Sequence, residues 1–380
     1  MSEWKCYKLN EISSLSNGIN FDKSAYTSGV KLIGVSDFKN RIHPDYDSLQ
    51  EVDSKVVKSG DYLEKGDIVF VRSNGNKELV GRCMMIDRDI PVTYSGFCIK
   101  LRLKDKKIFD PVFFNYLFKT RQFKKSMTGT AVGANIQNLS QSRLGSCEVN
   151  VPDIETQKEI ATILSRYDSL IENYQKQIKL LEEAAQRLYK EWFVDLHFPG
   201  HENTKIVDGV PEGWEKKNVT DIIDVKYGKD HKLLKDGEIP VYGTGGIMRY
   251  ADCSLYTGES VLIPRKGSLN NIMFVDETFW TIDTMFYSIP KIENAAKIVY
   301  FYLKGLDMYS MNIGAAVPSM TISILSGMNV LLPTNEIRLS FEGIITKYFD
   351  EIKELSSQIR LLTESRDRLL PKLMSGEITV

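Results

Sequence analysis

Residues 160–192 read IATILSRYDSLIENYQKQIKLLEEAAQRLYKEW and repeat apolar side chains in alternating steps of four and three residues. The members of this repeat are Ile160, Leu164, Tyr167, Ile171, Tyr174, Ile178, Leu181, Ala185, Leu188 and Trp192. A heptad pattern of this kind gives a helix one continuous apolar stripe, which is typical of coiled coils. The segment is therefore predicted to form one long helix that packs along a second helix.

A second helix with the same pattern is predicted later in the chain, where every residue number of the stripe is raised by 181. Its stripe consists of Phe341, Ile345, Tyr348, Ile352, Leu355, Ile359, Leu362, Arg366, Leu369 and Leu373, of which only Arg366 is charged. The same offset relates Pro152 to Pro333, and each proline precedes a good N-cap residue, Asp153 or Thr334. A single heptad run favours self-association, whereas two matched runs in one chain favour an intramolecular pair.

The segments ahead of the two helices also match each other, at an offset that decreases along the chain. At an offset of 210, Trp214, Val219, Ile222 and Gly228 match Trp4, Leu9, Ile12 and Gly18. Residues 258–263 match 66–71 at an offset of 192, and Gly314 matches Gly133 at 181. This pattern indicates a tandem duplication, with insertions between the structural elements of the first copy.

The first copy is predicted to mix short strands and turns with one helix. Strands are expected at 30–35, 67–71 and 98–103, where β-branched residues and alternation are found. Asp110 as N-cap and Pro111 at the first helical position predict a helix over 110–125. The first long helix is expected to end near Phe193, and Pro371 predicts a kink or an early end of the second.

The predicted fold class is α+β. It comprises two tandem-duplicated α/β globular domains separated by two long helices, which pair as an antiparallel coiled coil with pseudo-two-fold symmetry. The predicted boundaries are residues 1–152 for the first globular domain, 153–196 for the central long helix, 197–332 for the second globular domain and 333–380 for the C-terminal long helix.

Composition restricts the possible classes of function. With 380 residues the chain exceeds the size of one hydrophobic core, so two or more domains are expected. Lys and Arg total 49 and Asp and Glu total 50, so the net charge of −1 does not by itself indicate nucleic acid. The five cysteines include no Cys-x-x-Cys pair and are expected to be reduced thiols. No apolar run approaches the ~20 residues that span a bilayer, and a cytoplasmic protein is expected.

A catalytic site is not predicted. No glycine-rich loop ends in Lys-Ser or Lys-Thr, and the chain lacks the Pro-Pro of an adenine methyltransferase segment. Asp45, Asp53 and Lys55 fit a PD…D-x-K nuclease pattern, but such short patterns arise easily by chance. His197 and His201 flank a Phe-Pro-Gly loop and lack a third ligand, so a linker is favoured over a metal site.

Polar and basic residues occur in loops at matched places in the two copies. In the first copy the candidate DNA-binding residues are Arg72, Asn74, Asn76, Lys77, Arg82 and Gln137, accompanied by Thr128, Thr130, Asn135 and Asn138. In the second copy they are Tyr242, Thr244, Arg249, Arg265, Lys266, Ser268 and Asn270. Arginine and lysine donate to guanine edges or phosphates, and asparagine and glutamine pair with adenine. Ordinary solvated turns have a similar composition, but their matched positions favour a shared binding face.

Several motifs resemble those of one known family. They are LYKEWFVD at 188–195, VPEGW at 210–214, PVYGTGG at 240–246, RKGS at 265–268, TIDT at 281–284 and LLPKLMSGEI at 369–378. Together they span nearly the whole chain, and the last is the most specific. The chain therefore resembles the specificity (S) subunits of type I restriction-modification systems.

The resemblance implies a non-catalytic subunit whose two globular domains are target-recognition domains, each of which recognises one half of a bipartite site on double-stranded DNA. The helices would set the spacer and dock methyltransferase subunits. A helix of ~35 residues is ~50 Å long, which is comparable with one DNA turn of ~34 Å or somewhat more. In the family, two methyltransferase (M) subunits modify adenine with S-adenosylmethionine. Two restriction (R) subunits add cleavage that uses ATP and Mg²⁺, and no cofactor is expected in this chain.

Three alternatives stay open on the sequence alone. One is a related system in which a fused or separate methyltransferase-nuclease uses the same scaffold. Another is a coiled-coil scaffold that binds only proteins, which explains the heptads but not the duplicated polar loops. The third is an enzyme, for which only the loose carboxylate pattern near Asp45 and Asp53 is available.

Overall fold

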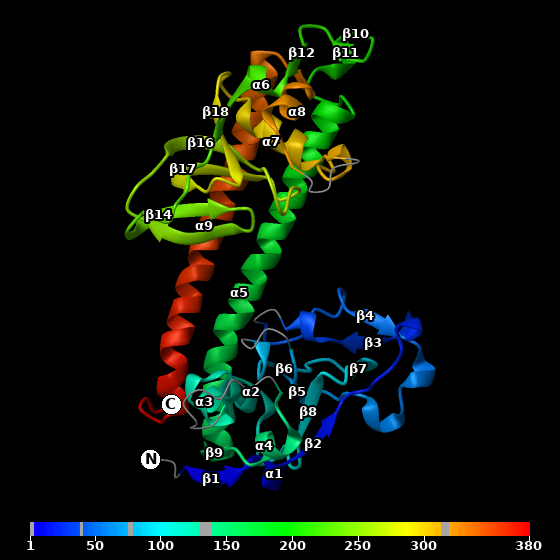
Figure 1. Cartoon of the computed structure of the whole chain (residues 1–380), viewed down its shortest axis with the longest axis vertical. Helices are drawn as coiled ribbons and strands as arrows, with labels where there is room; N and C mark the ends of the chain where they lie inside the picture. Colours follow the sequence, from blue (N-terminus) through cyan, green and yellow to red (C-terminus); the bar gives the residue numbers. More distant parts are fainter. Residues whose placement is uncertain (1–3, 39–40, 75–78, 129–137, 313–318) are drawn as a thin grey trace. The chain divides into compact units, whose positions relative to one another are not determined.

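The computed structural model describes residues 4–38, 41–74, 79–128, 138–312 and 319–380 (Figure 1). The chain divides into two compact units, unit 1 with residues 1–175 and 356–380, and unit 2 with residues 176–355. Two long helices contribute residues to both units. They are α5 (Ile154–Tyr189), which continues as a π-helical turn over Lys190–Val194, and α9 (Asn335–Met374).

Within each unit the two long helices pack in opposite directions. In unit 1, Ile160 near the start of α5 shares a hydrophobic core with Leu373 near the end of α9. In unit 2, Trp192 after the end of α5 packs on Phe341 near the start of α9, with ring centroids 5.8 Å apart. All twenty residues of the two predicted stripes are buried or half-buried. The predicted antiparallel pair is confirmed.

The starts of both long helices follow the prediction, whereas the end of α9 does not. Asp153 Oδ1 accepts a hydrogen bond from the Thr156 N–H at 2.9 Å. Thr334 Oγ1 accepts one from the Ile337 N–H at 3.5 Å. The early end predicted at Pro371 is wrong, because α9 continues to Met374. Only one turn follows the proline, so the helix loses a single backbone hydrogen bond near a terminus that frays in any case.

Unit 1 contains a four-stranded sheet in the order β2-β8-β5-β6, a three-stranded sheet in the order β4-β3-β7 and the ribbon β1-β9. Its strands are β1 (Lys5–Lys8), β2 (Ser13–Asn17), β3 (Tyr26–Ile33), β4 (Gln50–Val52), β5 (Ile68–Val71), β6 (Cys83–Met85), β7 (Val92–Tyr94), β8 (Cys98–Leu103) and β9 (Glu148–Val151). Its shorter helices are α1 (Leu9–Ile12), α2 (Pro111–Lys119), α3 (Arg121–Thr128) and α4 (Gln141–Gly145). All strand pairs are antiparallel except β3 with β7.

The predicted strands at 67–71 and 98–103 are confirmed as β5 and β8, and the strand predicted at 30–35 overlaps β3. The single helix predicted over 110–125 is wrong, because the chain is extended at Thr120 and forms two helices. The Thr120 hydroxyl donates to the Leu117 carbonyl (2.7 Å) and accepts from the Phe123 N–H (3.2 Å). A threonine side chain that bonds the backbone in this way ends one helix and caps the next.

Unit 2 contains a six-stranded sheet in the order β13-β18-β16-β17-β14-β15 and the ribbons β12-β19 and β10-β11. Its strands are β10 (Ile206–Val207), β11 (Val210–Pro211), β12 (Glu215–Asn218), β13 (Ile223–Tyr227), β14 (Asp236–Gly243), β15 (Gly246–Ala251), β16 (Tyr256–Pro264), β17 (Met273–Thr281), β18 (Met285–Pro290) and β19 (Asn329–Leu332). Its shorter helices are α6 (Val219–Ile222), α7 (Ala296–Lys304) and α8 (Ile322–Ser326).

Strand pairing confirms the duplication. In the ribbon β1-β9, Lys5 lies opposite Val151, and in the ribbon β12-β19, Glu215 lies opposite Leu332. The two pairs are related by the offsets that the sequence predicts for the start and the end of the repeat, so the two ribbons have the same register. Both copies also contain one parallel pair, β3 with β7 and β14 with β17. Gly133 and Gly314, which the prediction also matched, lie outside the described residues.

The offset of 192 predicted for the central strands β5 and β16 is too small by one. Val71 lies opposite Cys98 in unit 1, and Pro264 lies opposite Met285 in unit 2. Ser13 lies opposite Leu103 and its equivalent Ile223 lies opposite Pro290, so Cys98 is equivalent to Met285. The equivalent of Val71 is therefore Pro264 and not Ile263. A slip of one residue moves every side chain of a strand to the other face. The side chains of β5 and β16 that share a face are therefore paired correctly only when the offset is increased by one.

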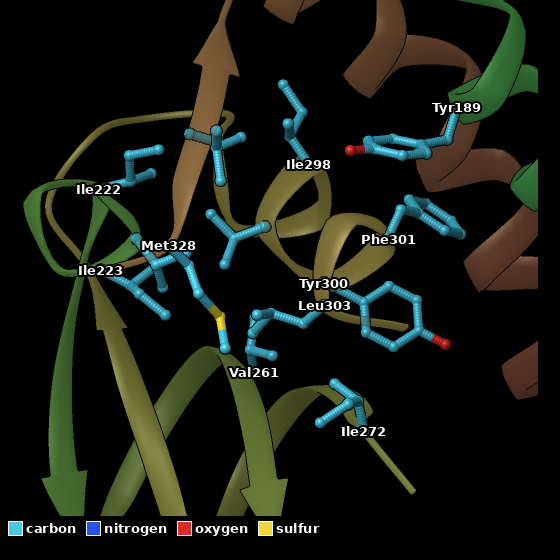
Figure 2. Packing of buried hydrophobic residues seen from close by; sticks show 14 of the residues in the cluster. Tyr189, Ile222, Ile223, Val261, Ile272, Ile298, Tyr300, Phe301, Leu303 and Met328 are labelled. Atoms are coloured by element: carbon cyan, nitrogen blue, oxygen red, sulfur yellow. The ribbon is translucent and has the colours of Figure 1, made fainter. Parts of the chain in front are cut away.

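The core of unit 2 includes the end of α5 as well as the sheet and its helices (Figure 2). Tyr189 of α5 stacks on Phe301 of α7, with ring centroids 5.6 Å apart. Val261 of β16 belongs to the same core, and so does Met328, the residue before β19. The helix is thus an integral part of the domain core.

Candidate nucleic-acid interface

Arg72, the first residue after β5, is held at its backbone and at its side chain. Its N–H donates to the Phe97 carbonyl (2.8 Å), and its carbonyl accepts from the Leu139 N–H (2.7 Å). Its guanidinium donates through Nη1 to the Gly96 carbonyl (3.5 Å) and through Nε to Asn138 Oδ1 (3.3 Å). The loop therefore determines where this cation lies.

Arg265, the first residue after β16, is held in the same way in unit 2. Its N–H donates to the Thr284 carbonyl (2.8 Å), and its carbonyl accepts from the Met320 N–H (2.9 Å). Its Nη1 donates to the Asp283 carbonyl (2.6 Å). Thr284 corresponds to Phe97 and Asp283 corresponds to Gly96, both at the same offset. Met320 corresponds to Leu139 at 181, the offset of the long helices. The two arginines are equivalent, a match that the predicted offset of the central strands missed by one position.

A glycine lets the chain cross closely beside each of these loops. A Cβ atom on Gly18 would lie 2.2 Å from the Tyr94 carbonyl oxygen, and one on Gly228 would lie 2.1 Å from the Ile282 carbonyl oxygen. No other residue fits either position. The sequence comparison matched these two glycines correctly, and the structure gives the reason for the match.

The other predicted residues of the second loop divide into exposed and structural ones. Lys266 and Ser268 are exposed and can face a ligand. Asn270 instead hydrogen-bonds to the loop that follows α7. The Thr244 carbonyl accepts a hydrogen bond from the Asn271 side chain (2.8 Å), which joins the β14-β15 turn to the arginine loop.

Two predicted residues of unit 2 are engaged by neighbouring carboxylates. The Tyr242 hydroxyl donates to Glu277, and burial together with this carboxylate raises the pKa of Tyr242. Arg249 forms an ion pair with Asp236, with Nη2 and Oδ1 2.7 Å apart, and also donates to a backbone carbonyl. The structure does not bring either side chain into the Arg265 hydrogen-bonding frame.

The predicted residues of unit 1 are less completely described. Asn74 is half-buried, and Arg82 donates through Nη1 to the Phe38 carbonyl (3.4 Å). Arg82 also lines a hollow in unit 1. The predicted residues outside the described part of the chain are Asn76, Lys77, Thr130, Asn135 and Gln137.

The hollow in unit 1 has a volume of about 950 Å³ and is lined by more cations than acids. Its charged lining residues are Arg41, Arg82, Lys119, Arg121, Lys124, Glu148, Arg366 and Asp367. Lys119 already donates to the carbonyls of Arg41 (3.0 Å) and Cys83 (2.9 Å), and burial lowers its pKa. Because the lining comes from separate segments, no local sequence signal marks it.

The residues of the loose nuclease pattern have structural partners. Asp45 forms an ion pair with Arg41 (2.9 Å), and Asp53 accepts a hydrogen bond from the Lys55 N–H (2.9 Å). Among the described residues, no three His, Cys, Asp or Glu side chains are grouped as a metal site would require. No helix in the described part of the chain is both long and apolar enough to cross a membrane.

The chain matches a family model described as the type I restriction modification DNA specificity domain, over residues 1–183 and 211–363. Over 297 residues it is 29% identical to the type I restriction enzyme MjaIX specificity subunit of Methanocaldococcus jannaschii, covering 70% of this chain and 68% of that protein. It is 22% identical to the HindI specificity subunit of Haemophilus influenzae over the full length of both proteins.

A solved structure gives the same fold. The crystal structure of the type I restriction-modification S subunit from M. genitalium matches with a TM-score of 0.62 and 18% identity, covering 98% of this chain and 96% of that one. The family model covers most of the chain in two segments, one for each copy of the duplication. The chain therefore belongs to the family of specificity subunits of type I restriction-modification systems.

Proposed function

We propose that this chain is the non-catalytic DNA-recognition subunit of its complex and that each globular domain recognises one half of a bipartite target. The observation that carries the proposal is the repeated arginine frame, in which Arg72 and Arg265 follow equivalent strands and are held by equivalent partners. Two equivalent cationic loops on separate domains suit two separate half-sites.

We further propose that α5 and α9 set the spacer between the half-sites and dock methyltransferase subunits. Helix α5 is continuous over 36 residues, which corresponds to about 54 Å. Sharp kinks need an identifiable cause such as a proline, and α5 contains no proline. In this proposal two M subunits use S-adenosylmethionine and two R subunits use ATP and Mg²⁺, and the complex acts in the cytoplasm on double-stranded DNA.

A repeated surface motif supports the docking of two equal partners. Residues 177–183 read QIKLLEE and residues 358–364 read QIRLLTE. In these motifs Leu180 is 63% exposed and Leu361 is 52% exposed. The duplication places a leucine at both positions, and both leucines are exposed in this chain. A partner that binds twice would cover one leucine with each of its copies.

Replacing either leucine with glutamate is expected to remove one methyltransferase copy from the complex, and the double replacement both copies. Covering a leucine contributes about 2 kcal/mol, which is roughly a 30-fold change in affinity. Native mass spectrometry of the purified complexes gives the stoichiometry. The matched control is Leu339→Glu, since Leu339 is 52% exposed on α9 but its counterpart is Lys158. An equal loss in this control contradicts the prediction.

Co-expression with the neighbouring methyltransferase gene tests the recognition of two half-sites. Genome-wide mapping of N6-methyladenine is expected to show one split motif with a fixed gap. Exchange of residues 197–332 for those of another member of the family is expected to change one half of that motif only. A soluble complex that methylates no defined motif contradicts DNA recognition and supports a scaffold that binds only proteins.

A further inference from the structure

The guanidinium of Arg265 is held along one edge and unoccupied along the other. Nη1 donates to the Asp283 carbonyl at 2.6 Å. Nε is buried and has no hydrogen-bond partner. The Nε edge of a guanidinium normally binds two acceptors side by side. The buried Nε–H of Arg265 therefore has no hydrogen-bond partner in the chain.

Two aromatic rings hold this guanidinium in position. Its Cζ lies 4.6 Å from the centroid of the Tyr227 ring and 5.1 Å from that of Phe286. Stacking on aromatic rings restricts the rotamers of an arginine without using its N–H groups. The side chain is thus oriented before any ligand binds, which lowers the entropic cost of binding.

Further unpaired polar atoms occur on the segments around Arg265. The Thr281 hydroxyl is completely buried and has no partner, and neither has Nδ1 of His231. Backbone hydrogen bonds join these segments, from Lys229 N–H to the Thr281 carbonyl (2.9 Å) and from Arg265 N–H to the Thr284 carbonyl (2.8 Å). A buried polar group without a partner costs about 1 to 3 kcal/mol, so such groups indicate a site that a ligand completes.

We propose that the Nε edge of Arg265 binds a pair of adjacent acceptor atoms on the DNA, and that Thr281 belongs to the same site. The inference rests on the proposed DNA recognition and assigns one contact within it. Two sources offer this chemistry, namely O6 and N7 of a guanine or two oxygens of a phosphate. Arg72 is the equivalent residue of the first domain, but its Nε already donates to Asn138 Oδ1 (3.3 Å), so the Nε contact is proposed for Arg265.

The test uses the complex of the full chain with its methyltransferase subunit. Binding is measured on a duplex that carries the mapped motif and on duplexes scrambled in either half, over a series of salt concentrations. Arg265→Ala is compared with Arg265→Lys, which keeps the positive charge but cannot donate two parallel hydrogen bonds from a planar guanidinium. The matched control is Lys291→Ala, which removes one positive charge beyond the opposite end of β18, where Lys291 bonds the Thr220 carbonyl.

A guanine contact predicts that Arg265→Ala and Arg265→Lys both weaken binding to the motif duplex by about 5- to 150-fold. The variant complexes would also accept any base at one position in one half of the motif. A phosphate contact predicts that Arg265→Ala weakens binding to all three duplexes equally, lowers the slope of log K against log salt by about 1, and is largely rescued in Arg265→Lys. Either result supports the proposal, and Arg72→Ala is expected to act on the other half.

Wild-type affinity, base preference and salt slope in Arg265→Ala would overturn the inference and leave the proposed function intact. A wild-type complex that binds all three duplexes equally instead overturns both. Thr281→Val removes the hydroxyl with little change in shape, and it is expected to weaken binding to the motif duplex if Thr281 belongs to the site. Unchanged binding in Thr281→Val removes that residue from the proposal.

Discussion

Replacing Lys297 with methionine is expected to lower the free energy of unfolding of unit 2 by about 3 to 5 kcal/mol. Lys297 of α7 is only 4% exposed, and its Nζ donates to Glu259 of β16 (2.5 Å) and to Glu342 of α9. Burial alone lowers the pKa of this lysine, but the hydrogen bonds to the two carboxylates outweigh burial and raise it. Methionine leaves both carboxylates in a partly buried site without their cation.

Tryptophan fluorescence during urea denaturation measures this effect. Trp192, Trp214 and Trp280, three of the four tryptophans, belong to unit 2, so their signal reports mainly on its unfolding. Lys304→Met is the matched control, since this lysine is on the same helix but exposed, and a change within about 0.5 kcal/mol is expected. Equal midpoints for the two variants would show that the buried ion pairs contribute nothing to stability.

Replacing Asp168 with asparagine is expected to destabilise unit 1 by about 2 to 3 kcal/mol. Asp168 of α5 accepts hydrogen bonds from Tyr116 of α2 (2.5 Å) and from Arg366 of α9. Burial and the Asp168 charge raise the pKa of Tyr116, so the phenol stays protonated as the donor. The loss is smaller than for Lys297 because Arg366 keeps Asp367 as a partner at 2.7 Å.

Hydrogen-exchange mass spectrometry locates this second effect. Faster exchange is expected in α2 and in the parts of α5 and α9 that belong to unit 1, whereas peptides of residues 176–355 keep their wild-type rates. Glu159→Gln, an exposed change on the same helix, is the control and is expected to alter neither unit. Faster exchange spread evenly over both units would contradict a role confined to unit 1.

The helical part of the fold could be predicted because its signal is local and periodic. The ten residues of each stripe recur in alternating steps of four and three, and caps at Asp153 and Thr334 mark the starts. Arg366 is a charged residue in an apolar stripe, but the sequence does not indicate its partner. That partner, Asp168, lies 198 residues away on the other helix, and no periodicity connects the two.

The candidate site could be predicted only at the level of loops. The matched glycines Gly18 and Gly228 locate the repeat, and their chemistry makes Arg72 and Arg265 both candidates. The sequence does not show that the two arginines are equivalent, because the glycines at 66 and 258 give an offset that differs by one position from the offset given by strand pairing. Tertiary hydrogen bonds define the register, and sequence similarity alone tolerates a slip of one residue. Thr281 belongs to the TIDT motif, but the motif does not indicate that its hydroxyl is buried without a hydrogen-bond partner.

The ribbons β1-β9 and β12-β19 have a consequence for how such proteins change over time. Each ribbon pairs the strand by which the chain enters a globular domain with the strand by which it leaves, in the same register in both copies. Neighbouring strands lie only about 5 Å apart, so a whole domain is inserted into the chain at two adjacent points. A gene conversion that crosses over within the two ribbon strands replaces a complete domain and keeps both long helices. A single recombination event can thus replace one globular domain without requiring changes in the rest of the chain.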